Sequence, residues 1–183
     1  MADQDAHASP NEESLESREP SVEDLVDLCR RLNEEGARYI VIGGFAVRAA
    51  GYDRRTMDVD LLIDTGVENE TKVFRALESL PDRAVRELEP GEVAEYTVIR
   101  VADEIVVDLM AAACGVGYAE ASADIACREI DGVPIPFASA RLLWRTKLTT
   151  HREKDQADLA FLRQYFAGRG EDPPSTDDGP PNH

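Results

Sequence analysis

The chain has 183 residues, of which 43% are hydrophobic, and it carries a formal net charge of −17. This length and composition predict one globular domain, and no apolar run approaches the roughly 20 residues that a transmembrane helix needs. The acidic charge argues against general binding to the nucleic-acid backbone. No signal peptide is expected at the N-terminus, and Cys29, Cys114 and Cys127 lack metal-ligand spacing, which favours reduced thiols in a cytoplasmic protein.

Charge and composition divide the chain into three parts. Residues 1–20 hold six acids and one arginine with few aliphatic side chains, so we expect a disordered acidic segment. Residues 168–183 hold four acids, one arginine and two Pro-Pro pairs, and are predicted to be a disordered tail. The domain is therefore predicted to span residues 21–167. Its last part, residues 138–167, reverses the charge with six basic and three acidic residues, which could serve phosphate binding.

Hydrophobic periodicity predicts alternating helices and strands. Ser21 followed by Asp24 is typical of a helix N-terminus, and Gly36 fits the end of that helix. Next in the chain we expect a buried strand over 39–42, a short helix over 45–50, a strand over 57–63 and a helix over 67–80. A short strand over 84–88 follows, and then strands over 96–101 and 104–110 joined by a tight turn. The last elements are a hairpin around Asp131-Gly132 and helices over 138–151 and 153–166, which are either separate or one bent helix. Residues 111–128 give no clear prediction. This order predicts an α/β or α+β fold, with helices covering a mixed sheet.

Two aspartates stand two residues apart in the strand predicted over 57–63. Asp58 and Asp60 alternate with apolar residues, so both carboxylates are expected on one side of the strand. Two like charges on a buried strand are costly unless a cation joins them, and a divalent metal that carries phosphates is the usual partner. Asp64 has the same parity, but the run Asp64-Thr65-Gly66 is more simply explained as a turn and a helix cap.

Asp108, in the apolar run 105–110, would complete a set of three carboxylates if its strand neighbours the other one. Phosphoryl chemistry with two metal ions needs several carboxylates around ions about 3.5–4 Å apart. Gly43-Gly44, between a strand and a helix, would let a phosphate approach backbone N–H groups because no Cβ intervenes. Each feature alone has an ordinary structural explanation, but their order and spacing together indicate a magnesium-dependent enzyme that handles a nucleoside triphosphate.

Three short motifs carry a resemblance to a known family. They are Ile42-Gly43-Gly44, then Asp58-Val59-Asp60-Leu61 after thirteen intervening residues, and later Val107-Asp108-Leu109. Together they resemble the nucleotidyltransferase superfamily of the DNA polymerase β type, over about residues 38–110. The resemblance implies a nucleotidyltransferase fold, a small mixed sheet flanked by helices, with Mg²⁺ ions and transfer of NMP from an NTP. Asp58 and Asp60 would bind two metal ions, and Asp108 would bind the catalytic ion and orient or deprotonate an acceptor hydroxyl.

A narrower resemblance comes from residues 54–60, 142–148 and 152–159. A lysine in an apolar helix followed by Arg-Glu-Lys-Asp-Gln-Ala-Asp-Leu resembles AbiEii-type toxins and related small bacterial nucleotidyltransferases. This resemblance implies that Lys147 contacts the triphosphate and that Asp155, or Asp158 as a near equivalent, supports the site. The other explanation of the last motif is a surface ion pair of Lys154 with Asp158.

The loop before the paired aspartates holds further candidates. Arg54 and Arg55 either contact phosphate or are solvated loop charges, and Arg55 is retained as a candidate substrate-binding residue. Tyr52 in the same loop is better explained by packing than by stacking on a nucleobase.

The leading hypothesis is therefore a cytoplasmic, magnesium-dependent nucleotidyltransferase that binds an NTP and a hydroxyl acceptor. The acceptor stays open between a protein, a small molecule and RNA. The alternative is a non-catalytic member of a toxin–antitoxin pair with the same fold, which acts by binding a cognate toxin or antitoxin protein. Neither hypothesis involves a membrane.

Overall fold

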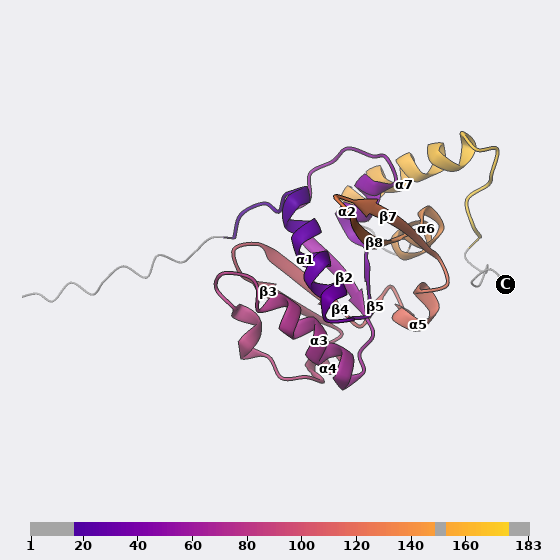
Figure 1. Ribbon diagram of the computed structural model, residues 1–183. Coiled ribbons are helices and arrows are strands. Elements are labelled where there is room, and N and C mark those ends of the chain that lie inside the picture. The colour runs from indigo at the N-terminus through magenta and orange to yellow at the C-terminus, as the bar shows by residue number, and fades with distance from the viewer. Residues whose placement is uncertain (1–16, 149–152, 176–183) are drawn as a thin grey trace, which may run out of the picture.

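A six-stranded mixed β-sheet with surrounding helices organises the described part of the chain (Figure 1). The computed structural model describes residues 17–148 and 153–175, without the side chain of Lys154. The strands of this sheet are β1 (Tyr39–Val41), β2 (Asp58–Ile63), β3 (Val98–Ala102), β4 (Val106–Met110), β7 (Ile125–Ile130) and β8 (Val133–Ala138). The helices are α1 (Val22–Glu34), α2 (Gly43–Ala49), α3 (Val67–Leu77), α4 (Glu92–Tyr96), α5 (Tyr118–Ala121), α6 (Ala140–Leu148) and α7 (Glu153–Ala167). Among the described helices, none is both long enough and apolar enough to cross a membrane.

The strand order of the sheet is β3-β4-β2-β1-β8-β7. The pairs β2–β4 and β1–β8 are parallel, whereas β1–β2, β3–β4 and β7–β8 are antiparallel. A mixed sheet flanked by helices confirms the predicted fold class. The parallel pairing of β2 with β4 also makes direct neighbours of the two strands that carry the candidate metal ligands.

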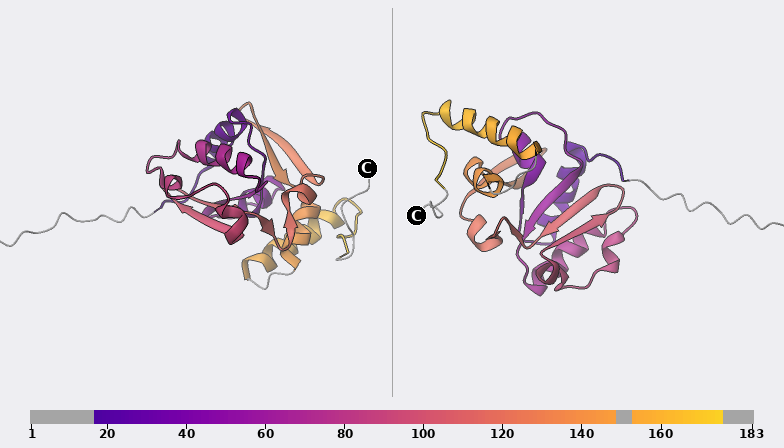
Figure 2. Two further views of the ribbon diagram at one scale, coloured as in Figure 1. Left: turned by 90° about the horizontal axis from the view of Figure 1, so that it is seen from below. Right: turned by 180° about the vertical axis from the view of Figure 1, so that it is seen from behind.

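The helices lie in two groups around this sheet. Helices α1 and α3 lie side by side along the sheet, and their buried faces belong to the main core (Figure 1). Helices α6 and α7 pack against each other on the β8 side of the molecule (Figure 2). Helix α2 contacts β2, β8 and α6, so it connects the sheet to the C-terminal helices.

The N-terminus of α1 lies at Ser21, as the sequence predicts, and a capping box closes it. Ser21 Oγ accepts a hydrogen bond from Asp24 N at 3.2 Å, and Asp24 Oδ2 accepts one from Ser21 N at 2.7 Å. The Arg18 guanidinium, followed by the Ser21 N–H and hydroxyl, holds the pKa of the Asp24 carboxyl below its usual value. Arg18 N also donates to Glu104 O at 2.8 Å, so this part of the N-terminal segment contacts the turn between β3 and β4.

The domain boundaries at residues 21 and 167 stay predictions. Residues 1–16 and 176–183, which make up most of the N-terminal and half of the C-terminal segment predicted to be disordered, lie outside the described residues. Of the C-terminal segment, Pro174 is buried and its carbonyl accepts a hydrogen bond from Trp144 Nε1 at 3.1 Å. Residues 149–152 also lie outside the described residues, so the choice between two helices and one bent helix is not resolved by α6 and α7.

The strand predicted over 84–88 is wrong, because Ala84–Glu87 form a 3-10 helix. The reason is the buried Asp103, whose carboxylate accepts hydrogen bonds from Asp82 N and Ala84 N at 3.0 Å each. A side chain 19 or more residues away thus caps the turn, and local sequence patterns do not reveal such a contact.

The hairpin between β3 and β4 is also shifted from its predicted form. Ala102 pairs with Val106, so three residues rather than two form the turn and β4 begins at Val106 instead of residue 104. Tyr96, predicted as the first residue of the strand, ends helix α4. The hairpin around Asp131-Gly132 is confirmed, and its strands extend from Ile125 to Ala138.

The segment without a prediction, residues 111–128, contains short elements. It forms a two-stranded sheet of β5 (Ala112–Ala113) and β6 (Val116–Gly117), the one-turn helix α5 and the start of β7. Elements of two to four residues carry no periodic signal, so their absence from the sequence interpretation has a simple cause.

Candidate active site

Three aspartates from two adjacent parallel strands meet on one side of the sheet. Asp58 and Asp60 are half-buried, whereas Val59 and Leu61 between and after them are fully buried, as the predicted alternation requires. Asp60 lies directly opposite Asp108 in the register of β2 and β4. Each of the three offers a carboxylate oxygen that lies within 4.8 Å of the other two.

Gly43 and Gly44, which open helix α2 two residues earlier than the predicted helix over 45–50, pack directly against this cluster. Gly43 has φ +60°, and a Cβ built on it would lie 1.9 Å from Asp60 Oδ2. A Cβ on Gly44 would lie 2.2 Å from Thr56 Oγ1. The glycines therefore make room for protein side chains of the site itself, in addition to the phosphate contact that the sequence predicts.

Thr56 supports the cluster through contacts with Asp58. The sequence interpretation did not single it out. Its side chain is buried, and its hydroxyl donates to Asp58 O at 3.1 Å and lies 3.5 Å from Asp58 Oδ1. A threonine two residues before an aspartate is too common a pattern to be informative in one sequence.

Arg100 is a second residue that the sequence interpretation missed. It projects from β3, where it pairs with Asp108, and forms a two-pronged contact with that carboxylate: Nε to Oδ1 and Nη2 to Oδ2, both at 2.8 Å. Its Nη2 also lies 3.4 Å from Asp58 Oδ2. The hydrogen bonds to Asp108 raise the pKa of the Arg100 guanidinium further above its usual value.

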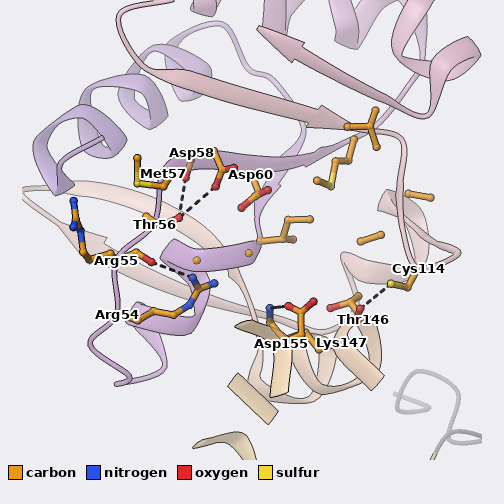
Figure 3. Close-up of a pocket in the computed structure, with 17 residues that line it drawn as sticks. Arg54, Arg55, Thr56, Met57, Asp58, Asp60, Cys114, Thr146, Lys147 and Asp155 are labelled. Atoms are coloured by element: carbon orange, nitrogen blue, oxygen red, sulfur yellow. Dashed lines mark hydrogen bonds and ion pairs between the residues drawn. The ribbon is translucent and has the colours of Figure 1, made fainter. Parts of the chain in front are cut away.

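A cavity of about 480 Å³ opens beside Asp58 and Asp60 (Figure 3). This volume lies within the ~300–1,000 Å³ that small-molecule sites occupy. The sheet side presents the two aspartates, and the C-terminal helices present Lys147 and Asp155 across from them (Figure 3). Both glycines of the turn also line the cavity.

Lys147 is held in a buried charge network between α6 and α7. Its Nζ lies 2.9 Å from Asp155 Oδ1 and 2.7 Å from Asp158 Oδ2, and the whole residue is 7% exposed. Arg54 Nε lies 3.0 Å from the other oxygen of Asp158, which is fully buried. The contacts of Asp158 are charge pairs rather than well-aligned hydrogen bonds among the described residues.

This network gives Asp155 and Asp158 different positions relative to the cavity. Asp155 lines it, and Asp158 lies behind Lys147, where it faces two cations. A fully buried Asp158 is inconsistent with the exposed i,i+4 ion pair considered for this position.

The remaining sequence candidates lie at the rim or outside the site. Arg55 lines the cavity, yet its side chain is 81% exposed and pairs with Glu19, with Nε 3.1 Å from Oε2. Asp64 accepts from Gly66 N at 2.9 Å, which agrees with the predicted turn. Tyr52 stacks on Phe161 with ring centroids 5.0 Å apart, which agrees with the predicted packing role.

The three aspartates form a donor set that fits a divalent metal. All candidate ligands are carboxylate oxygens, which Mg²⁺ and similar hard cations prefer. Arg100 already places a cation against two of the three carboxylates. The cluster could therefore hold metal ions between β2 and β4. Its negative charge lies beside a cavity large enough for a small molecule.

Comparisons with known proteins support the fold. No protein-family model and no curated protein sequence matches this chain. The structure is similar to the crystal structure of an antigenic nucleotidyltransferase-like protein from Paracoccidioides brasiliensis, with a TM-score of 0.50 and 17% sequence identity. The similarity covers 78% of this chain and 74% of that one. The protein therefore has a nucleotidyltransferase-like fold, and it carries an aspartate cluster that could hold metal ions.

Proposed function

We propose that the protein is a magnesium-dependent nucleotidyltransferase that transfers NMP from an NTP to a hydroxyl acceptor. The observation that carries this proposal is the convergence of Asp58, Asp60 and Asp108, from adjacent parallel strands, beside a glycine turn and a cavity. The similarity in fold to a nucleotidyltransferase-like protein adds support.

In this proposal Asp58 and Asp60 would hold two Mg²⁺ ions, and Asp108 would contribute a ligand on the acceptor side. The bound ions would supply charge neutralisation and a lower pKa for the acceptor hydroxyl. Asp108 orients that hydroxyl and accepts its proton as the new P–O bond forms at the α-phosphate. The bond from the α-phosphate to the pyrophosphate leaving group breaks in the same displacement.

The opposite wall of the cavity is proposed to hold the triphosphate. Lys147 presents a cation there and Asp155 positions it, while the backbone of Gly43-Gly44, beside Asp60, would approach a phosphate from the other side. Arg55 at the rim could join them after leaving Glu19. The roles proposed for Lys147 and Asp155 are those that the narrower resemblance to AbiEii-type toxins implies.

Transfer of a labelled nucleotide tests this proposal. The full chain is incubated with Mg²⁺ and each α-labelled NTP, alone and with protein, aminoglycoside and tRNA acceptors, and both label transfer and pyrophosphate release are measured. We expect Asp58→Asn and Asp60→Asn to lower the rate at least about 100-fold, because each removes charge that the transition state needs.

Asp64→Asn is the matched control, since it neutralises an aspartate just beyond β2 whose carboxylate binds Gly66 N and Arg38 instead of the cluster. Equal transfer by the Asp60 variant and the wild type would contradict the proposal. Failure of the wild type to bind any NTP with Mg²⁺ would favour the non-catalytic alternative, a toxin–antitoxin partner.

A further inference from the structure

Arg100 places its positive charge against two aspartates of the cluster, Asp108 and Asp58. Its guanidinium contacts both oxygens of Asp108 at 2.8 Å and lies 3.4 Å from Asp58. Among the described residues, Arg100 is the cation that contacts both Asp58 and Asp108. Arg100 thus neutralises part of a cluster that carries three negative charges within 4.8 Å.

The same contact restricts what Asp108 can do. A carboxylate has about four lone-pair positions, and the planar fork of an arginine takes one on each oxygen. Asp108 itself is only 6% exposed, and it is not among the residues that line the cavity. With Arg100 in place, the carboxylate has limited capacity for a metal ion or an acceptor hydroxyl.

Arg100 is also placed so that it can leave. Its strand, β3, is at the edge of the sheet, and its side chain is 60% exposed. An ion pair of a long, exposed side chain is weak, and the side chain regains rotamer freedom when it leaves the pair for water. The positive charge of a bound divalent ion would repel the guanidinium, which favours replacement of Arg100 by the metal ion at Asp108.

We propose that Arg100 is a built-in counter-cation that competes with divalent metal for Asp108. Without metal it holds the carboxylates together, and metal binding releases it from Asp108. This inference rests on the proposed metal site, and it adds a residue that sets how much metal the site needs.

Binding of Mn²⁺ to the full chain, followed by electron paramagnetic resonance, tests this inference without an activity assay. We expect Arg100→Gln to bind Mn²⁺ about three- to tenfold more tightly than the wild type, the range for loss of an exposed but two-pronged ion pair. The same variant should unfold at a lower temperature without metal, and recover wild-type stability at saturating Mn²⁺.

Arg86→Gln is the matched control. Arg86 also makes a two-pronged contact, with Nε and Nη2 3.0 and 2.8 Å from Glu78 Oε2, and its side chain is 56% exposed. Its loss changes the net charge equally but removes no contact to the cluster, so Mn²⁺ affinity should stay within about twofold of the wild type. Arg100→Lys, which cannot form the fork, should give an intermediate affinity and serves if the glutamine variant fails to fold.

The outcomes separate the two proposals. Unchanged or weaker Mn²⁺ binding in Arg100→Gln, with normal binding by the wild type, would overturn the role of Arg100 and leave the metal site intact. Mn²⁺ binding by neither protein would overturn both. Binding by the variant alone would support the inference strongly, because it would identify Arg100 as the group that keeps metal out.

Discussion

Gly43 connects backbone conformation to the position of a candidate metal ligand. Its φ of +60° is a conformation that residues with a Cβ rarely adopt, and the Asp60 carboxylate fills the space where that Cβ would lie. The glycine is therefore required twice, once for the turn and once for the approach of Asp60. Sequence reasoning identified Gly43 through phosphate binding, and this second role depends on a contact that only coordinates provide.

Gly43→Ala should displace Asp60 and weaken divalent binding. A Cβ at 1.9 Å from Asp60 Oδ2 cannot be accommodated without moving that carboxylate. We expect about tenfold or greater loss of Mn²⁺ affinity, together with about 1–3 kcal/mol of backbone strain. Isothermal titration with Mn²⁺ and thermal unfolding measure the two effects separately.

Gly36→Ala is the control for strain alone. Gly36 has φ +65°, and nothing lies within 4 Å of a Cβ built on it. It should lose stability to a similar extent and keep full Mn²⁺ affinity. If Gly43→Ala also kept full affinity, the proposed contact between the turn and the metal site would be wrong.

Other residues of the site differ in how far the sequence could predict them. The Asp-x-Asp pattern places Asp58 and Asp60 on one side of a strand by geometry alone, and the structure agrees. Arg100 could not be placed, because a two-residue turn at Ala102-Asp103 would have paired it with Ile105. The observed three-residue turn pairs it with Asp108 instead. The observed turn begins one residue later and is one residue longer than the predicted turn, which moves the partner of Arg100 by three positions, from Ile105 to Asp108.

At the scale of elements, the parallel pairing of β2 and β4 assembles the site. It aligns Asp60 with Asp108 across 48 residues of sequence, and the crossover between the strands includes α3 and α4. Hydrophobic periodicity predicted both strands but could not determine that they are neighbours. The predicted metal site required the two strands to be neighbours. This expectation came from the resemblance to a known family, because local patterns do not reveal which strands pair.

The contact between α6 and α7 depends on a charge that lies entirely within the protein. Asp158 is 0% exposed and faces both Lys147 and Arg54, which come from α6 and from the loop before β2. It therefore joins the C-terminal helices to the loop that leads into the aspartate strand. The sequence identified Asp158 only as a near equivalent of Asp155, since burial distinguishes the two and the motif does not.

Asp158→Asn should destabilise the fold strongly. Removing one partner of a buried charge pair leaves Arg54 under-compensated, and about 3 kcal/mol of unfolding free energy should be lost. Urea unfolding followed by circular dichroism measures the loss.

The control for this change is Asp27→Asn on α1. Asp27 pairs with Arg30, but its side chain is 73% exposed. Its loss should cost less than about 1 kcal/mol. Equal effects of the two substitutions would show that the Asp158 network contributes no more than a surface pair.

At the scale of the whole molecule, the sequence indicated the class of fold but not its topology. Alternating helices and strands predicted a mixed sheet, and six strands with flanking helices are observed. The order of the strands depends on long-range contacts, such as the parallel pairing of Val41 with Phe137, for which no local signal exists. The net charge of −17 is a whole-molecule property as well, and it argues against general binding to the nucleic-acid backbone.

In the proposed function, Asp58, Asp60 and Asp108 bind divalent ions that carry a nucleoside triphosphate. The most direct test is a crystal structure of the full chain with Mn²⁺ and a nonhydrolysable NTP, with the ions located by anomalous scattering. We expect anomalous peaks between the three carboxylates and a triphosphate that extends along the cavity toward Lys147. Peaks at other residues with the cluster empty, or a nucleotide bound away from this cavity, would contradict it.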